Sequence, residues 1–231
     1  MTKASRMAAE TTGFPDILTK LNGVMVVRVL SHYYPSAAKC LSEKIGASSR
    51  FTLVSDIGGN SPQFLVKKAA GMIARNELDS VLIAGGETYY PRDKRNIGKG
   101  NLLFKGLKGK HERKDMIGST EIEIQHGISL PIYGFPLYET ALWAESGMEL
   151  SLYLERVGKL WSEFSRIAAM HPNAWTKAPR SPREIITTDS TNRLVAFPYT
   201  KYMNPLISVD LGAAIILMSA EKSRQLRKKG R

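Results

Sequence analysis

The stretch GGNSPQFLVKKAAGMIARNELDSVLIAGGE, residues 58–87, predicts a sharp turn, a helix and a strand in immediate succession. The paired glycines at its start let the backbone bend tightly, and Pro62 suits the first turn of a helix. Asn60 or Ser61 can cap this helix, which we expect to end near Arg75. Its apolar residues recur at helical spacing and predict one buried face: Leu65, Ala69, Met72 and Ile73.

The residues before and after this helix alternate between strand-like and helix-like patterns. Apolar runs predict buried strands at Val24–Leu30, at Phe51–Val54 and at Val81–Ala84, the last ended by Gly85 and Gly86. Two further helices are expected before the stretch, at 8–20, broken by Gly13 and Pro15, and at 35–45, ended by Gly46. This alternation predicts an α/β fold with a parallel sheet that helices cover on both faces.

After Glu87 the alternation stops, and roughly a hundred residues precede the next buried strand, Val209–Met218. A connection of that length is too long for a plain loop in a compact domain, so we expect an insertion with its own structure. A long helix is predicted in it, with a stripe that packs as core: Leu150, Leu154, Val157, Trp161, Phe164 and Ala168. Residues 172–205 are polar and punctuated by prolines, and they predict an ordered loop.

The composition is that of a globular domain. The chain has 231 residues, of which 43% are apolar and 23% charged, and it can bury a sizeable core. Its longest apolar runs are far too short to cross a membrane, and its first residues lack the apolar segment of a secretory signal. The single cysteine, Cys40, excludes an internal disulfide and agrees with a reducing compartment. We therefore expect a cytoplasmic protein without a membrane span.

A formal net charge of +12 distinguishes the chain from an average domain. Such a surplus favours polyanions, which include nucleic acids, anionic membranes and phosphorylated small molecules such as nucleotides or coenzyme A. Much of it lies in Arg224–Arg231 and in one Gly-containing stretch: Arg92, Lys94, Arg95, Lys99, Lys105, Lys108, Lys110, Arg113 and Lys114. These runs either keep a surface solvated or attract an anionic ligand.

The start of the helix at Pro62 is the first candidate site. Because the helix follows a parallel strand, its free N–H groups and partial positive charge lie where α/β proteins bind anions, hold oxyanions or activate nucleophiles. A well-capped helix without any ligand would have the same local sequence. The turn alone therefore leaves both interpretations open.

Four segments resemble the thiolase superfamily. The stretch 58–87 is similar to the segment that carries the family's nucleophile, its helix and the following strand. YGFPLYETALWAESGMELSLYLERVGKLWSEFSRIAA (133–169) resembles the loop domain, and VDLGAAIILMSAE (209–221) resembles the strand that ends the family's first half. HPNAWTKAPRSPREIITTDSTNRLVAFPYTKYMNPLISVD (171–210) is closest to the acetyl-CoA acetyltransferase, or thiolase-like, branch related to the sterol-carrier thiolases.

The resemblance implies the first, N-terminal half of a thiolase-like fold, with a parallel-rich sheet and a large α-rich loop-domain insertion. We expect the core half at residues 1–90 and 206–222, the loop-domain insertion at 91–205 and a basic tail at 223–231. Family members continue into a second half that supplies a catalytic histidine and a second cysteine, and their first strand would precede Ala8 here. The chain is therefore expected to be a fragment, a split product or a protein that needs another chain, with an unpaired central position in its sheet.

By resemblance, the function is that of an acyltransferase of lipid metabolism, which transfers an acyl group from acetyl-CoA or a longer acyl-CoA. A working thiolase has a cysteine at the start of this helix, where the thiolate is favoured. Comparison with the family places that cysteine at Gly59, or at Asn60 if the gap is moved, and neither residue can accept an acyl group. Ser61 is the nearest nucleophile but has no visible base beside it, so we expect the chain alone to be inactive.

The ligand implied by the resemblance is coenzyme A or an acyl-CoA, with no covalently bound cofactor and no metal. Its phosphates would meet basic residues beside the loop domain, for which we single out Lys105, Lys108 and Lys110. Cys40 is expected to pack as a small apolar residue, and His171, in a Met-His-Pro triplet, to be structural.

Two other functions stay open. One is a non-catalytic module that binds acyl-CoA or acts as a scaffold. The other is a basic nucleic-acid binder, although the interleaved aromatic and basic residues of such proteins are missing. The expected partner is another protein chain or the second half. The helix at Pro62 would then lack its outer cover, and exposed apolar residues would make the lone monomer unstable: Leu65, Val66, Ala69, Met72 and Ile73.

Overall fold

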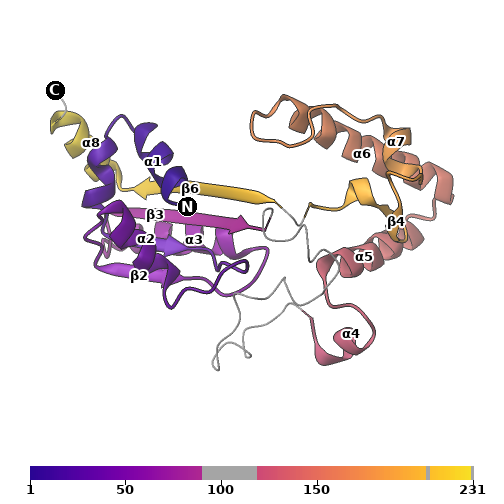
Figure 1. The fold of residues 1–231 in the computed structure, drawn as a ribbon, viewed down its shortest axis with the longest axis horizontal. Helices are drawn as coiled ribbons and strands as arrows, with labels where there is room; N and C mark the ends of the chain where they lie inside the picture. Colours follow the sequence, from indigo (N-terminus) through magenta and orange to yellow (C-terminus); the bar gives the residue numbers. More distant parts are fainter. Residues whose placement is uncertain (90–118, 207–208, 230–231) are drawn as a thin grey trace. The chain divides into compact units, whose positions relative to one another are not determined.

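A computed structural model describes residues 1–89, 119–206 and 209–229. The chain forms two compact units (Figure 1), which we call the core unit, residues 1–118 and 207–231, and the insertion unit, residues 119–206. The predicted limits of the insertion, 91 and 205, stay a prediction, because residues 90–118 lie outside the described residues.

A four-stranded mixed sheet forms the centre of the core unit, in the order β2-β1-β3-β6. β1 pairs in parallel with β2 on one side and with β3 on the other, whereas β6 is antiparallel to β3. The predicted α/β fold with a parallel-rich sheet is confirmed, although the last strand runs against the others. The strands are β1 (Gly23–Val26), β2 (Phe51–Val54), β3 (Ser80–Thr88) and β6 (Asp210–Met218).

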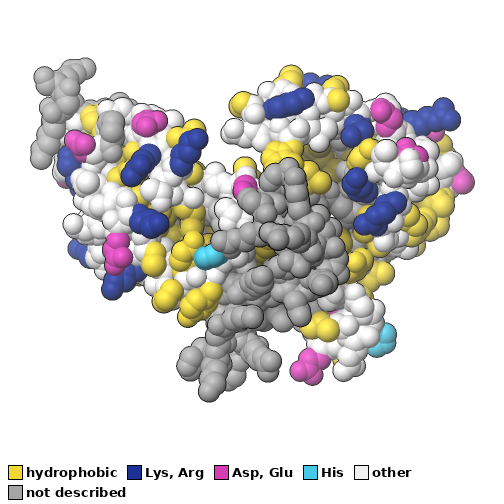
Figure 2. Space-filling model, viewed as in Figure 1, with side chains coloured by type: hydrophobic (Ala, Val, Ile, Leu, Met, Phe, Trp, Pro, Cys, Tyr) yellow, Lys and Arg dark blue, Asp and Glu magenta, His cyan; other side chains and the backbone are white. Residues whose placement is uncertain are grey.

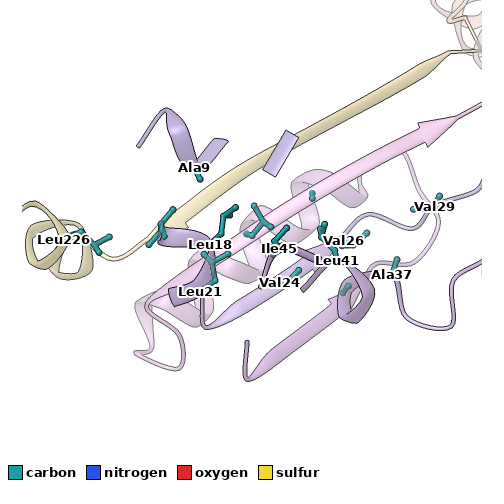
Figure 3. Close-up of a cluster of buried hydrophobic side chains, with 14 residues drawn as sticks. Ala9, Leu18, Leu21, Val24, Val26, Val29, Ala37, Leu41, Ile45 and Leu226 are labelled. Carbon is teal, nitrogen blue, oxygen red and sulfur yellow. The ribbon is translucent and has the colours of Figure 1, made fainter. Parts of the chain in front are cut away.

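Helices cover both faces of this sheet. On one face, α1, η1, α2 and α8 enclose side chains that include Val24, Val26 and Leu82 (Figure 3). On the other face, α3 packs on the intervening residues, among them Met25 and Ile83. The alternation of side chains along each strand produces this division. The helices are α1 (Thr2–Glu10), η1 (Pro15–Lys20), α2 (Ala37–Ile45), α3 (Ser61–Ala74) and α8 (Ala220–Lys229).

The ends of α2 follow the sequence signals. The Ser36 hydroxyl accepts a hydrogen bond from a backbone N–H of the first turn, and Gly46 ends the helix with a φ of +72°, in the left-handed region that favours glycine. Two other helices have different limits from those predicted. α1 begins six residues before Ala8, the predicted start, and α8 includes residues 223–229 of the predicted basic tail.

Two strands also differ from the prediction in where they end. β1 ends at Val26 rather than Leu30, and a loop follows. β3 continues through the glycine pair at 85–86, because β6 pairs with it in continuous register over the whole length of both strands. Pairing with a segment far along the chain therefore outweighs the tendency of two glycines to weaken a strand.

The sheet has no unpaired central position among the described residues, contrary to the expectation from the family. β1 pairs with both of its neighbours, and all four of its residues are buried. The four strands therefore form one continuous sheet.

The expected apolar patch on α3 is also absent. Leu65 and Ala69 are buried, and the other three residues of the expected patch are partly buried against the sheet: Val66, Met72 and Ile73. Other apolar side chains of the core unit are exposed instead, including Phe64 of α3 and Leu211 and Ile215 of β6. On the face of the molecule drawn in Figure 2, hydrophobic side chains reach the surface of both units between the charged ones. β6, predicted to be buried, is thus largely exposed over its first half.

The insertion unit is mostly helical and has a small core of its own, formed by Tyr153, Val157, Ile185 and Met203. The stretch predicted to be an ordered loop contains the helix α7, the hairpin β4–β5 and the turn η4. In neither unit is any described helix long and apolar enough to cross a membrane. The elements are α4 (Glu121–Gln125), α5 (Pro131–Ser146), α6 (Leu150–Met170), α7 (Pro182–Ile186), β4 (Leu194–Ala196), β5 (Tyr199–Thr200) and η4 (Lys201–Met203).

The stripe predicted along α6 is only partly buried. Val157 is buried and Trp161 packs against the core, whereas Phe164 is exposed. On the adjoining side, Gly158 lies where α7 comes closest: a Cβ at this position would lie 2.9 Å from the Pro182 carbonyl oxygen. The missing side chain therefore allows the two helices to touch.

Two polar side chains connect the elements of the insertion unit. Glu139 of α5 accepts hydrogen bonds from the hydroxyls of Tyr153 and Tyr199, each at 2.6 Å. Burial, followed by the bond to Glu139, raises the pKa of both tyrosines, that of Tyr153 to about 12. Asn192 is fully buried and accepts a hydrogen bond from the Tyr202 N–H. Its amide nitrogen donates to the carbonyls of Glu184, Ile185 and Thr187.

Candidate functional site

The candidate site lies at the carboxyl ends of the parallel strands. The turn of residues 55–60 connects β2 to α3, as the sequence predicts, and the loop after β1 is hydrogen-bonded to it. Because β1, β2 and β3 are parallel, the segments that follow them meet at one edge of the sheet.

Ser55, at the start of the turn, joins it to the end of β1. Ser55 is buried, and its N–H donates to the Val26 carbonyl at 3.0 Å. Its hydroxyl accepts a hydrogen bond from the Arg28 N–H at 3.1 Å and donates to the Asp56 carbonyl at 2.9 Å. The turn is thereby fixed to the neighbouring strand before the helix begins.

α3 begins without the side-chain cap that the sequence predicts. Asn60 occupies the cap position with helical dihedral angles, φ −86° and ψ −5°; its carbonyl accepts a hydrogen bond from the Phe64 N–H at 2.9 Å, but its side chain accepts none from the first turn. The hydroxyl of Ser61 instead donates to the Asp56 carbonyl at 2.8 Å, and Ser61 is buried. The Ser61 hydroxyl therefore connects the helix to the turn and does not accept a hydrogen bond from the N–H groups at the helix start.

The two glycines of the turn differ in the space beside them. A Cβ at Gly58 would lie 2.7 Å from Asn60 Oδ1, so the asparagine side chain covers this glycine. Apart from the two neighbours of Gly59 in the chain, no atom of the described residues lies within 4 Å of the same position at Gly59. The N–H of Gln63 has no hydrogen-bond acceptor within the described part of the chain, and Pro62 has no N–H. Gly59 therefore borders open space at a helix N-terminus, which stabilises negative charge.

This arrangement can hold an anion or an oxyanion, but within the described residues it contains no activated nucleophile. Gly59 has no side chain, and an amide such as that of Asn60 is a poor nucleophile. The Ser61 hydroxyl donates to a backbone carbonyl, and no titratable side chain in the described ranges forms a hydrogen bond with it. The same ranges contain no group of three His, Cys, Asp or Glu side chains that could hold a metal ion.

Glu87 is a residue of this edge that the sequence analysis did not single out. Its two carboxylate oxygens accept hydrogen bonds from the backbone N–H groups of Leu30 and Ser31, each at 2.7 Å. The Ser31 hydroxyl in turn accepts one from the Thr88 N–H at 3.1 Å. The end of β3 therefore holds the loop that follows β1. An acidic residue directly after a glycine pair was the available signal in the sequence.

The other predicted site residues are not brought to this edge by the described structure. Cys40 is partly buried on α2. His171 directly follows α6 in the insertion unit, where its Nδ1 accepts a hydrogen bond from the Asn173 N–H at 3.2 Å and its carbonyl accepts one from Lys177. The proposed phosphate contacts lie outside the described residues: Lys105, Lys108 and Lys110.

Two solved structures resemble the chain over nearly its whole length. The monomeric SCP2-thiolase like protein type 1 from Mycobacterium smegmatis has a TM-score of 0.77 and 27% sequence identity, over 98% of this chain and 43% of that one. The Ltp2–ChsH2(DUF35) aldolase has a TM-score of 0.67 and 15% identity, over 96% of this chain and 50% of that one. The chain thus spans half or less of the length of these proteins. No protein-family model and no curated protein sequence matches it.

Proposed function

From the thiolase-like fold of this chain, we propose that it forms one part of an acyltransferase that acts on acetyl-CoA or a longer acyl-CoA. In this proposal, the start of α3 stabilises negative charge on the reacting acyl group. A second half or another polypeptide supplies the nucleophile and the acid and base. The likeness to an SCP2-thiolase like protein supports this division, since the chain spans 43% of that protein. A cytoplasmic location and a role in lipid metabolism are parts of the same proposal.

The open space beside Gly59 is the observation that carries the proposal. A helix N-terminus that follows a parallel strand is a place where α/β proteins hold anions and oxyanions. Within the described residues that position is unobstructed, and those around it provide no activated sulfur or oxygen. A chain with this geometry is suited to complete an active site rather than to form one alone.

Cleavage of acetoacetyl-CoA by the purified chain in the presence of coenzyme A tests this proposal. We expect no turnover above background, because no side chain in the part of the chain that the structure describes serves Ser61 as a base. Turnover that is lost in Ser61→Ala and kept in Ser48→Ala, an exposed serine remote from the turn in sequence, would contradict the proposal and assign the nucleophile to Ser61.

The proposed ligand contacts are tested separately by calorimetry with coenzyme A. We expect the affinity to fall with added salt and with Lys105, Lys108 and Lys110 changed to Glu, because phosphates are attracted to basic side chains. A matched control changes three exposed lysines of the core unit to Glu, Lys20, Lys39 and Lys44. If neither added salt nor the substitution of Lys105, Lys108 and Lys110 lowers the affinity for coenzyme A, the basic segment does not bind the phosphates. Salt-dependent binding of DNA without binding of coenzyme A would favour a nucleic-acid function.

A non-catalytic module that binds acyl-CoA, or a scaffold, is the second candidate function. The described turn contains no activated nucleophile. This observation agrees equally well with a binding module and with an active site divided between two chains. The two are distinguished by adding a thiolase-like second half in trans: a divided enzyme gains turnover, whereas a binding module retains bound acyl-CoA without consuming it.

A further inference from the structure

Helix α5 of the insertion unit (Figure 1) has an apolar outer face. Of its 16 residues only Glu139 and Glu145 are charged, and Glu139 is bonded to two tyrosines within the unit. A helix that is apolar on all sides is normally buried. Four large apolar side chains of α5 are exposed instead: Phe135 (61%), Leu137 (55%), Tyr138 (70%) and Leu142 (61%). This surface, which we call the α5 face, is therefore suited to contact another surface.

Small and large residues follow a regular pattern on the α5 face. Residues three, four and seven positions apart lie on the same side of a helix. Phe135 and Leu142 therefore border the face on one side, and Leu137 borders it on the other. Between them runs a row that includes two small residues: Gly134, Tyr138, Ala141 and Glu145. The small residues allow a second helix to approach closely, and the large ones enclose the contact.

The distribution of charge favours a second copy of this chain as the occupant of the α5 face. The insertion unit has eight Lys and Arg residues against nine Asp and Glu residues, so the surplus of +12 belongs to the rest of the chain. An anionic membrane or a nucleic acid would be attracted to the core unit instead. Two copies repel each other through the same surplus, and they repel least when they meet through their insertion units.

We propose that the α5 face binds the α5 face of a second copy, with the two helices antiparallel about a two-fold axis beside Tyr138. A two-fold contact requires a surface that is complementary to itself. About this axis, each residue faces the residue equally far on the other side of Tyr138. Phe135 then lies over the small Ala141 of the second copy, and Leu142 lies over Gly134 of the second copy. Large side chains thus meet small ones along the contact.

The single charge of the α5 face also finds a complement in this arrangement. Glu145 forms no hydrogen bond or ion pair within the described residues, and it would lie opposite Pro131 of the second copy, where α5 begins. That helix start has no side-chain cap, and the Ile132 N–H has no acceptor in the described part of the chain. Because a helix N-terminus stabilises negative charge, each copy provides a favourable site for the carboxylate of the other.

The apolar area of the α5 face is close to what a specific dimer needs. If each of the four large side chains contributes roughly 100 Å² of exposed surface, one copy provides roughly 400–500 Å² with the smaller residues between them. The two copies together then bury roughly 1,000 Å², near the lower limit for a specific interface. We therefore expect a weak dimer, with a dissociation constant in the micromolar range. This inference does not depend on the proposed function.

Sedimentation equilibrium of the full chain tests the proposal, and a dimer is the expected result. Tyr138→Lys and Ala141→Lys, both at exposed positions of α5, should each raise the dimer dissociation constant at least about tenfold. The reason is that each change places a charge in an apolar contact of both copies. Ala70→Lys, at an exposed position in the middle of α3, is the matched control and should leave the constant unchanged.

A second pair of variants tests the contact of the carboxylate. Glu145→Lys should also raise the dissociation constant, because a positive charge beside the helix start of the second copy is unfavourable. Glu155→Lys changes the net charge by the same amount at an exposed position of α6 and should have a smaller effect. Equal effects of the two variants would contradict the proposed place of Glu145.

Cross-linking tests the register. In a Cys40→Ser background, a short bis-maleimide should join two copies of Ala141→Cys, since the two residues are separated by about 9 Å along the helices. Ser146→Cys, at an exposed position in the last turn of α5, would be about 24 Å from its counterpart and should not be joined.

Three results would overturn the proposal. The first is a wild-type chain that stays monomeric at a few hundred micromolar. The second is a dimer that persists in both Tyr138→Lys and Ala141→Lys, and the third is cross-linking of Ser146→Cys without that of Ala141→Cys. A monomer that binds anionic vesicles, and loses this binding in Tyr138→Lys, would likewise overturn it and assign the α5 face to a membrane.

Discussion

At Gly59 the backbone borders open space at the start of α3, so a side chain can be introduced where the site would need one. We expect Gly59→Cys to fold like the wild type, because no described atom beyond its chain neighbours lies within 4 Å of the new Cβ and the φ of Gly59 is not in the left-handed region. The helix N-terminus should lower the pKa of the new thiol by about one unit or more from its ordinary value near 8.5. The pH dependence of alkylation, measured in a Cys40→Ser background, reports this pKa.

Ala70→Cys is the matched control for this experiment, because Ala70 is exposed in the middle of the same helix. Its thiol should titrate near the ordinary value, since the helix dipole acts within the first and last turns. If the thiol introduced at Gly59 titrates at or above the control, the helix start does not stabilise negative charge there. The anion-holding role of the turn would then be wrong.

Asn192 connects several backbone groups of the loop in the insertion unit. Its side chain is fully buried and satisfies three carbonyl groups and one N–H. We expect Asn192→Ala to lower the free energy of unfolding by about 1–3 kcal/mol, because these backbone groups lose their partner away from water. Asn173→Ala, at an exposed position of the same unit, should change it by less than about 0.5 kcal/mol. Urea unfolding followed by circular dichroism measures both, and equal effects would contradict the role of Asn192.

These residues show where sequence reasoning about the site ends. The turn, its place before a helix and the lack of an activated nucleophile near Gly59 follow from residue types. The bond from Ser61 to Asp56 does not, because a serine at a helix start can equally accept from the helix or donate to the turn. The bonds of Glu87 to the loop after β1 depend on two strands lying side by side, which the local sequence does not specify.

At the scale of elements, Glu139 ties α5 to α6 and to β5 through two tyrosine hydroxyls. Burial, followed by the bond to Glu139, raises the pKa of Tyr153 from its ordinary value of 10.0 to about 12. A raised tyrosine pKa means that the folded chain favours the protonated phenol. The corresponding stability is fully present below about pH 10 and is lost as the pH rises through about 12.

We therefore expect the insertion unit of the wild type to lose stability between about pH 10 and 12, and Tyr153→Phe to lose less over the same interval. Comparing the two proteins removes the contribution of lysines, which titrate in both. Tyr138→Phe is the control, since Tyr138 is 70% exposed on α5. Thermal unfolding at a series of pH values provides the measurement. Parallel curves for the wild type and Tyr153→Phe would show that Tyr153 does not contribute.

The elements also differ in how far the sequence predicts them. α2 follows local rules of capping and periodicity, so its predicted and observed limits nearly agree. β3 extends past Gly85 and Gly86 because its partner β6 arrives from the far end of the chain. The direction of β6 and its exposure depend on the same long-range pairing. The hairpin of β4 and β5 was missed because prolines and polar residues are typical of loops as well as of hairpins.

On the scale of the whole chain, the positive charge is unevenly distributed. The insertion unit has eight Lys and Arg residues and nine Asp and Glu residues, so the surplus of +12 belongs to the rest of the chain. An anionic ligand is therefore expected to be attracted by the core unit, which includes residues 90–118, rather than by the insertion unit. The composition alone shows that the chain has an excess of positive charge. The division into two units shows that this excess belongs to the core unit.

Each unit has a hydrophobic core of its own, and we expect two separable unfolding transitions in calorimetry of the full chain. Leu65→Ala should lower the free energy of unfolding of the core unit by about 2–5 kcal/mol, and with it the temperature of that transition. Leu65 is fully buried between α3 and the sheet. The transition of the insertion unit should stay in place.

Gly158→Ala provides the reciprocal test, and its outcome depends on two opposing effects. Alanine is favoured over glycine inside a helix by about 1 kcal/mol, which would stabilise α6. The new Cβ, however, would lie 2.9 Å from the Pro182 carbonyl oxygen and 2.8 Å from a methyl group of Ile186. The Pro182 oxygen belongs to the backbone, so it can move only if α7 moves. Overpacking of this kind costs about 1–3 kcal/mol, which exceeds the gain in helix propensity. We therefore expect a lower free energy of unfolding for the insertion unit and no change for the core unit. If both variants shift one common transition by similar amounts, the two units unfold as one.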